Sequence, residues 1–169
     1  MRPQVSGSAC GFFVSDGEFV SVREMTPADL DEVMLIEKAS FPFPWSTRFF
    51  LQELQAQCAR SIVAEIGDRI VGYVIFWLLP DGVIDVHNVA VHGNFRRRGI
   101  GRCLLEQVIA EARRRNSVRV TLEVRKSNSG AQRLYESVGF IKTGIRQGYY
   151  SDDGEDALTM TLDLATHNS

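Results

Sequence analysis

The sequence predicts one α/β domain of the α+β type, built on a mixed sheet of about seven strands with about four helices on its two faces. The length of 169 residues, with 44% hydrophobic and 24% charged residues, fits a single globular domain. Apolar periodicity switches between two and three-to-four residues in the order β-α-α-β-β-β-α-β-α-β-β. One part of this order is a strand, a crossover helix and a strand, which predicts a parallel pair with a right-handed connection.

The N-terminal part of the chain supplies a first strand and the start of a first helix. Residues 1–19 mix Ser, Gly, Cys and Phe without periodicity, so we expect a flexible extension there and a single domain over residues 20–169. Residues 20–24 are expected to form a short strand. Thr26, followed by proline and then by Asp29, has the spacing of a capping box at the start of a helix.

Two prolines and a glycine-containing turn delimit the next elements. Pro42 and Pro44 cannot continue a helix, so the first helix ends before them, near residue 40, and Ser46 caps a second helix. Gly67 and Asp68 separate two apolar runs and are typical of a two-residue hairpin turn. The elements expected in this stretch are a helix containing residues 49–54 and strands at residues 61–66 and 69–79.

Periodicity also assigns the second half of the chain. An apolar run that begins after a proline- and glycine-containing turn predicts a strand, and an amphipathic helix and an alternating strand follow it. A polar segment, Ser-Asp-Asp-Gly at residues 151–154, separates the last two strands. The expected strands are residues 84–91, 118–124, 140–150 and 157–164, and the expected helices are residues 99–115 and 129–138.

Composition argues against several functional classes. A net charge of −2 and a pI of about 5.9 are unlike the strongly basic face of a nucleic-acid binder. The cysteines are widely spaced, which offers neither a disulfide framework nor a zinc site and fits a reducing compartment. The longest apolar run is shorter than a membrane span, and residues 1–19 lack the apolar core of a signal peptide. We therefore expect a cytoplasmic monomer or weak dimer with no nucleic-acid or membrane partner.

An arginine- and glycine-rich turn at residues 96–101, Arg-Arg-Arg-Gly-Ile-Gly, is the most informative segment. It follows the strand at residues 84–91, and open α/β sheets bind ligands beyond the carboxyl ends of such strands. The helix that it opens presents unpaired N–H groups with a partial positive charge, and glycines let the main chain approach an anion. The turn indicates a pyrophosphate site for a phosphorylated cofactor, with an exposed basic turn as the alternative.

Several segments resemble the GNAT superfamily of N-acetyltransferases. The turn resembles the R/Q-x-x-G-x-G/A signature with which these enzymes hold the pyrophosphate of acetyl-coenzyme A. Residues 122–128 and 134–140 are similar to the LEVRxSN…LYESxGF block of the ribosomal-protein-alanine acetyltransferases, the RimI type. Phe-Pro-Trp-Ser at residues 43–46 and the tyrosine pair at 149–150, with the acidic residues after it, are similar to the same family. The resemblance runs from about residue 20 to residue 164.

This resemblance implies a GNAT fold, in which the sheet is mostly antiparallel and its one parallel pair of strands is splayed. It implies an acyltransferase that uses acetyl-coenzyme A as the acetyl donor and needs no metal. The implied acceptor is the α-amine of a protein N-terminus, above all the N-terminal alanine of the eighteenth protein of the small ribosomal subunit. Two rival functions stay open: acetylation of a small amine such as a polyamine or an antibiotic, and non-catalytic binding of coenzyme A by an interaction module.

The resemblance also implies a set of cofactor contacts. Asn128 would contact the pantetheine arm, although a helix N-cap is the simpler interpretation of an asparagine before a helix. Main-chain groups of the strand around Ala90 would pair with the same arm and polarise the thioester carbonyl, with an ordinary buried strand as the alternative. The implied contacts are Val89, Ala90, Val91, Arg96, Arg97, Arg98, Gly99, Ile100, Gly101, Arg102 and Asn128.

Two residues of the RimI-type block match the proton-handling positions of the family. Glu123 matches the general base that takes a proton from the amine, directly or through water, whereas strand periodicity alone favours a solvated carboxylate. An α-amine has a pKa of about 7.8 and a lysine one of about 10.4, a difference worth about 3.5 kcal/mol, so a single carboxylate suits a protein N-terminus better. Tyr135 matches the general acid that protonates the departing thiolate, with core packing as the alternative.

Aromatic residues are expected to border the peptide substrate. By resemblance, Phe43, Trp45, Tyr149 and Tyr150 border the peptide groove, and hydrophobic contacts between layers are the alternative interpretation. The acidic segment at residues 152–156 is expected to form a solvated hairpin tip that could attract a basic ribosomal-protein tail.

Overall fold

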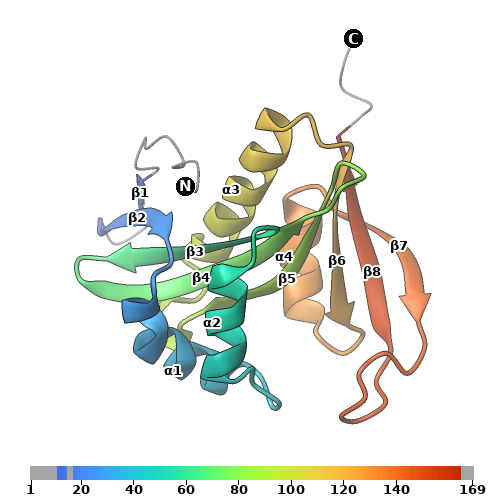
Figure 1. Ribbon diagram of the computed structural model, residues 1–169. Coiled ribbons are helices and arrows are strands. Elements are labelled where there is room, and N and C mark those ends of the chain that lie inside the picture. The colour runs from blue at the N-terminus through green and yellow to red at the C-terminus, as the bar shows by residue number, and fades with distance from the viewer. Residues whose placement is uncertain (1–10, 15–16, 165–169) are drawn as a thin grey trace.

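One eight-stranded mixed sheet runs through the part of the chain that the structure describes, residues 11–14 and 17–164 (Figure 1). The structure is a computed structural model. Its strands are β1 (Gly11–Phe13), β2 (Phe19–Glu24), β3 (Ala59–Ile66), β4 (Arg69–Leu78), β5 (Val83–Val91), β6 (Arg119–Arg125), β7 (Ile141–Arg146) and β8 (Ala157–Asp163). Their order is β1-β2-β3-β4-β5-β6-β8-β7, and every neighbouring pair is antiparallel except β5–β6. The predicted mixed sheet with one parallel pair is confirmed.

Helices cover both faces of the sheet, as the sequence predicts (Figure 1). They are α1 (Leu30–Ser40), α2 (Thr47–Gln55), α3 (Ile100–Arg114) and α4 (Ser129–Ser137), with short 3-10 turns η1 (Pro27–Asp29) and η2 (Gly93–Phe95). The core divides accordingly. Phe50 and Tyr73 are buried on the α1–α2 side, and Leu104 and Leu105 are buried on the α3–α4 side. No helix in the described ranges is long and apolar enough to span a membrane.

The N-terminal boundary differs from the prediction. Residues 11–13 of the expected extension form β1 instead and pair antiparallel with β2. Val14 is 5% exposed and belongs to the core beside α3. The expectation is wrong here because Gly-Phe-Phe-Val is too short to show a period, and its burial depends on a strand that follows it. Residues 1–10 and 15–16 of the expected extension lie outside the described residues.

The start of α1 carries a charged cap. The predicted helix begins with the 3-10 turn η1, and α1 continues from it. Asp29 accepts the main-chain N–H of Thr26 at 2.7 Å, in keeping with the predicted capping box. Arg23, on β2, donates to both carboxylate oxygens of Asp29 at 2.8 Å. The pKa of Asp29 lies below its usual range, mainly because Arg23 donates these hydrogen bonds to the carboxylate.

We expect Arg23→Met to lower the free energy of unfolding at neutral pH, with a loss that shrinks in acid. Because the folded pKa of Asp29 is depressed, its contribution is fully present above the unfolded pKa of about 3.9 and disappears as pH falls through the folded value. Urea unfolding at about pH 7, 4 and 2.5 measures the loss, with Arg119→Met as a control at an exposed arginine. An equal loss at all three pH values would count against this origin of the stability.

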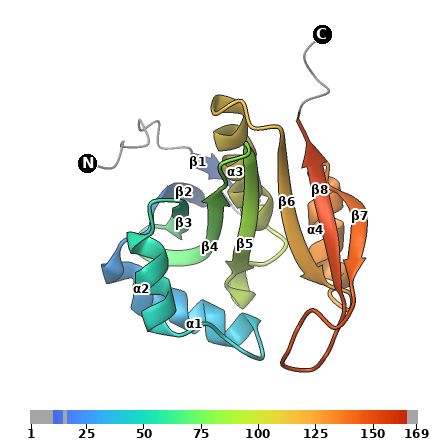
Figure 2. The ribbon, with the colours of Figure 1, turned by 45° about the vertical axis from the view of Figure 1, so that its right-hand side comes forward.

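The parallel pair β5–β6 separates along its length. The two strands pair over four residues each, and the pairing ends at Val86 on β5 and Leu122 on β6. β5 continues to Val91 and β6 to Arg125, so their carboxyl ends diverge (Figure 2). This is the splayed pair that the family resemblance implies. The facing edges beyond Val86 and Leu122 keep main-chain N–H and C=O groups that the other strand does not satisfy.

A β-bulge in β5 changes the face that its side chains reach. Val86 is opposite Phe76 on β4 and Asn88 is opposite Ile75, so His87 is the extra residue. Val86 belongs to the core beside α3, whereas Asn88 reaches α1 on the other face of the sheet. A strict period of two would put both on the same face. The bulge therefore directs the Asn88 amide to the face of the sheet that α1 covers.

Candidate active site

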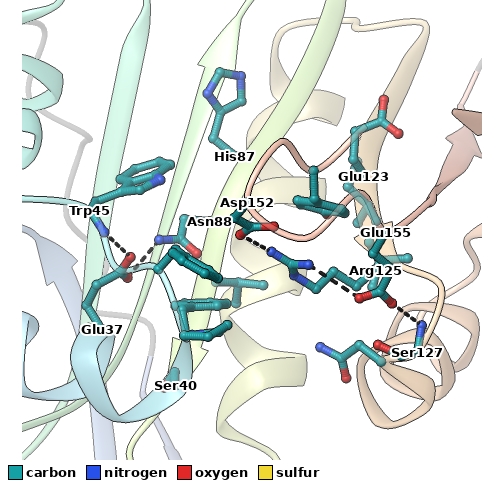
Figure 3. A pocket seen from close by; sticks show the side chains of 18 of the residues that line it. Glu37, Ser40, Trp45, His87, Asn88, Glu123, Arg125, Ser127, Asp152 and Glu155 are labelled. Atoms are coloured by element: carbon teal, nitrogen blue, oxygen red, sulfur yellow. Dashed lines mark hydrogen bonds and ion pairs between the residues drawn. The ribbon is translucent and has the colours of Figure 1, made fainter. Parts of the chain in front are cut away.

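A cavity of about 560 Å³ opens where β5 and β6 diverge (Figure 3). Its walls come from residues 86–89 of β5 and from residues between 122 and 128, and the α1–α2 loop and the β7–β8 loop border it. Seven of the residues predicted for the site line this cavity. They are Phe43, Trp45, Val89, Glu123, Asn128, Tyr135 and Tyr150. The cavity thus brings together segments that are far apart in the sequence.

Glu123 lies on the cavity wall, on β6. Its neighbours Leu122 and Val124 are buried, and the alternation of the strand turns the carboxylate to the opposite face. Thr159 on β8 donates its hydroxyl to Oε2 at 2.8 Å, and the Nε of Arg146 on β7 lies 3.1 Å from Oε1. The Arg146 side chain is 61% exposed, so this ion pair is weak and its loss costs little. The carboxylate is therefore oriented by its neighbours and can exchange one of them for a substrate.

Tyr135 lies on α4 and reaches the same cavity. It is buried, and its ring makes an edge contact with Phe140 with centroids 6.1 Å apart. Burial, with a smaller effect of Tyr150, raises the pKa of its hydroxyl. A hydroxyl with a raised pKa stays protonated at neutral pH and is able to donate a proton. The residue packs in the core and also borders the cavity, so its two interpretations are compatible.

The predicted phosphate turn lies between the carboxyl end of β5 and the start of α3. Gly99 is the N-cap of α3 and has a φ of +88°, a left-handed conformation that other residues rarely adopt. A Cβ added at Gly101 would lie 3.0 Å from Cδ2 of Leu134, so a side chain there would crowd α4. The first N–H groups of a helix have no acceptor within it. The turn therefore fits a phosphate group, although it does not line the cavity itself.

The side chains of the turn differ in what they offer a ligand. Ile100 is 1% exposed in the core, so only its main chain is open to a cofactor. Arg102 forms an ion pair with Glu106 at 3.1 Å, one turn along α3. Arg98 lies over the ring of Phe95, 5.0 Å from its centroid. The arginines that precede the helix are Arg96, Arg97 and Arg98.

The unpaired strand edge and Asn128 complete the predicted cofactor contacts. Residues 87–91 of β5 have no partner on β6, so main-chain groups on that edge are available. Val89 lines the cavity, Ala90 is buried on the α1 side and Val91 packs against the core beside α3. The Oδ1 of Asn128 accepts the N–H of Ala131 at 3.2 Å, so Asn128 caps α4 and borders the cavity as well.

The aromatic residues predicted for the peptide groove do not all lie at the cavity. Phe43 is exposed at its border, and Trp45 packs against Phe50 with ring centroids 5.5 Å apart. Tyr150 lines the wall, and burial raises the pKa of its hydroxyl to about 12. Tyr149 is exposed and lies outside the wall, where its ring makes an edge contact with the Tyr150 ring. The structure therefore brings three of the four to the cavity.

Arg125, at the end of β6, organises one wall of the cavity although the sequence patterns do not single it out (Figure 3). Its guanidinium donates to Asp152 at 2.5 Å, to Asp153 at 3.0 Å and to Glu155 at 3.3 Å. It also lies over the Tyr150 ring, 4.0 Å from the centroid. The acidic loop is exposed at residues 151–154, as expected of a solvated tip, but these ion pairs also tie it to β6. Arg125 lies 27 to 30 residues before these carboxylates in the sequence, so no local pattern could reveal the contact.

Glu37, on α1, is a second cavity residue that the sequence patterns leave out (Figure 3). Its Oε1 accepts the main-chain N–H of Trp45 at 3.0 Å. Its Oε2 accepts the Asn88 amide at 2.8 Å and the hydroxyl of Tyr73, whose pKa burial raises. The sequence does hold a signal for it. Glu37 follows Val33 by four residues, so a carboxylate interrupts the apolar face of a helix.

The geometry defines a class of protein. A helix start that fits an anion lies next to an unpaired strand edge, and that edge borders a cavity lined by a carboxylate and by a tyrosine with a raised pKa. Such a site suits acyl transfer from a coenzyme A thioester to an amine. The model of the Acetyltransferase (GNAT) family matches residues 30–140, more than half of the chain. The chain belongs to the GNAT acetyltransferase family and is an acyltransferase.

Known relatives place the chain more narrowly within this family. The ribosomal protein bS18-alanine N-acetyltransferase of Salmonella typhimurium is 36% identical over 147 residues, 86% of this chain and 98% of that protein. The N-alpha-acetyltransferase RimI of Mycobacterium tuberculosis is 36% identical over 154 residues, 88% of this chain and 96% of that protein. The crystal structure of the Escherichia coli ribosomal-protein-S18-alanine N-acetyltransferase matches with a TM-score of 0.79 and 32% identity, over 89% of this chain and 97% of that one. The predicted GNAT fold and the resemblance to the RimI type are confirmed.

Proposed function

We propose that the chain acetylates the α-amine of a protein N-terminus from acetyl-coenzyme A, and that the N-terminal alanine of ribosomal protein bS18 is its main substrate. The observation that carries this is that Glu123 and Tyr135 line one cavity at the gap between β5 and β6. Relatives named for acetylation of the bS18 alanine support the choice of substrate. Ribosomal proteins are made in the cytoplasm, where we propose that the chain acts as a monomer or weak dimer.

The proposed cofactor site extends from the start of α3 along the unpaired edge of β5. N–H groups around Gly99 and Gly101 and the guanidinium groups of the turn hold the pyrophosphate. Main-chain groups of residues 89–91, together with Asn128, hold the pantetheine arm. When bound, acetyl-coenzyme A supplies an activated carbonyl carbon with a thiolate as leaving group.

Glu123 and Tyr135 have complementary roles in this proposal. Glu123 accepts a proton from the substrate amine, directly or through water, as the N–C bond forms. Tyr135 donates its hydroxyl proton to the sulfur as the C–S bond breaks. The two substrates are bound together, so no acyl-enzyme is required. Holding the amine in line with the carbonyl carbon contributes a large part of the rate.

Mass spectrometry of three acceptors tests the proposal. The protein is incubated with acetyl-coenzyme A and a bS18 N-terminal peptide, the same peptide with a blocked α-amine and a free lysine, or spermidine. We expect acetylation of the first acceptor alone, on its α-amine, because the amine with the lower pKa loses its proton more readily. Acetylation of spermidine or of the blocked peptide, with none on the free N-terminus, would overturn the proposed function.

A further inference from the structure

The cavity contains more negative charge than its arginines neutralise. The carboxylates that line it are Glu37, Glu123, Asp152, Asp153 and Glu155. Arg146 pairs with Glu123, and Arg125 pairs with the three acidic residues of the β7–β8 loop. Of these five carboxylates, Glu37 alone has no cationic partner among residues 11–14 and 17–164. Lys38, the next residue along the chain, is exposed and does not line the cavity.

The surroundings of Glu37 solvate a charge without neutralising it. The side chain is 1% exposed, and its three donors are an N–H, an amide and a hydroxyl, all of them neutral. Burying a carboxylate is costly unless it is paired, so the absence of a cation needs a reason. A carboxylate has about four acceptor positions, of which these donors fill three. One position is left for a further donor.

Two neighbouring features favour a cation at the same place. Glu37 and Ser40 lie in the last turn of α1, and the carbonyl end of a helix carries a partial negative charge. The Ser40 Oγ is buried, lines the cavity and has no hydrogen-bond partner among the described residues. His87 on β5 also lines the cavity, but its Nε2 lies 3.0 Å from Asp85 Oδ2 and is already engaged there. The end of α1 therefore offers a negative, partly unsatisfied site that faces the substrate cavity.

We propose that Glu37, with Ser40 and the carbonyl end of α1, is the counter-ion site for the α-ammonium group of the incoming peptide. This inference rests on the proposed function, because it needs an amine substrate that arrives protonated. Glu37 acts in binding and Glu123 acts afterwards, when the proton leaves the nitrogen. Loss of the Glu37 charge therefore raises KM for the peptide more than it lowers kcat.

A pair of peptides that differ only in the amine separates this role from a structural one. Calorimetry in the presence of coenzyme A compares the bS18 N-terminal peptide with its des-amino analogue, in which a propionyl group replaces alanine. We expect the wild-type protein to bind the amino peptide about tenfold more tightly, and Glu37→Gln to bind both peptides equally. A merely structural defect would weaken both peptides by the same factor. Retention of the wild-type ratio in Glu37→Gln would overturn the inference.

Three further variants sharpen the test. Exchanging the two partners in Glu37→Gln/Asn88→Asp returns a carboxylate to the same hydrogen bond, and we expect the preference for the amino peptide to recover. Glu53 is another buried carboxylate, and it does not line the cavity; its Oε2 accepts a hydrogen bond of 2.7 Å from Trp77 Nε1. Glu53→Gln should therefore leave the ratio of the two affinities unchanged. If Glu37→Gln does not fold, Ser40→Ala decides, because an unaltered ratio there would overturn the inference.

The outcomes also separate this inference from the proposed function. If the wild-type protein acetylates no N-terminal peptide, the proposed function fails. If the wild-type protein acetylates the N-terminal peptide but binds the amino and des-amino peptides equally, the proposed function stands and the counter-ion role of Glu37 fails.

Discussion

Glu123→Gln should lower kcat for the N-terminal peptide by about 100-fold or more while leaving the affinity for coenzyme A nearly unchanged. The amide has the size of the carboxylate and can still accept the Thr159 hydroxyl, but it cannot take a proton from the amine. The ion pair with Arg146 is also lost, at little cost because that arginine is largely exposed. Steady-state kinetics from about pH 6 to 9, together with calorimetry of coenzyme A, measure both quantities.

A matched glutamate shows whether the loss belongs to this position. Glu136 on α4 is about half exposed and lies 3.8 Å from Lys142 in an ion pair, so Glu136→Gln changes charge to the same extent away from the cavity. We expect its kcat to equal that of the wild type. Turnover of Glu123→Gln that matches the wild type across the whole pH range would remove the general-base assignment.

Tyr135→Phe should lower kcat by about 100-fold with little change in the free energy of unfolding. The phenyl ring keeps the edge contact with Phe140, so the core is preserved, but the proton that the sulfur needs is gone. Burial keeps the Tyr135 pKa above its ordinary value, so the wild-type hydroxyl is protonated throughout the working range of pH. Kinetics and urea unfolding of the same preparation separate the catalytic loss from a loss of stability.

Tyr149→Phe is the control for Tyr135→Phe. Tyr149 is exposed and lies outside the cavity wall, so loss of its hydroxyl should leave kcat unchanged. A Tyr135→Phe enzyme within about twofold of wild-type turnover would exclude a general-acid role and leave Tyr135 as a core residue. Equal losses in both tyrosine variants would point to an effect on the cavity as a whole.

Local patterns predict most of the fold, because helices and tight turns depend on residues close in sequence. The helix expected at residues 99–115 is α3, Ile100–Arg114, and the glycines of the expected hairpin and phosphate turns, Gly67 and Gly99, have positive φ values. Alternation correctly buries Leu122 and Val124 and turns Glu123 to the other face. The gap between β5 and β6 came from the family resemblance, since no periodicity reports where two paired strands separate.

The features that sequence patterns miss depend on partners far along the chain. Strand β1 is recognised only by its pairing with β2, and the last strand before the acidic loop is shorter than expected, Ile141–Arg146 in place of residues 140–150. Arg125 contacts carboxylates about 30 positions later in the chain, and Glu37 accepts a hydrogen bond from Asn88 on β5. Neither contact can be read from neighbouring residues. The bulge at His87 that aims Asn88 at Glu37 changes the period within a strand, which a uniform alternation cannot reveal.

Hydrogen–deuterium exchange with and without coenzyme A tests most directly whether the gap between β5 and β6 is the cofactor site. The expected result is slower exchange at residues 87–91, whose edge lacks a partner on β6, and at residues 99–103 at the start of α3, with no change in β1 and β2. Saturating coenzyme A that leaves residues 87–91 and 99–103 unprotected would contradict the placement of the donor, and with it the roles given to Glu123 and Tyr135.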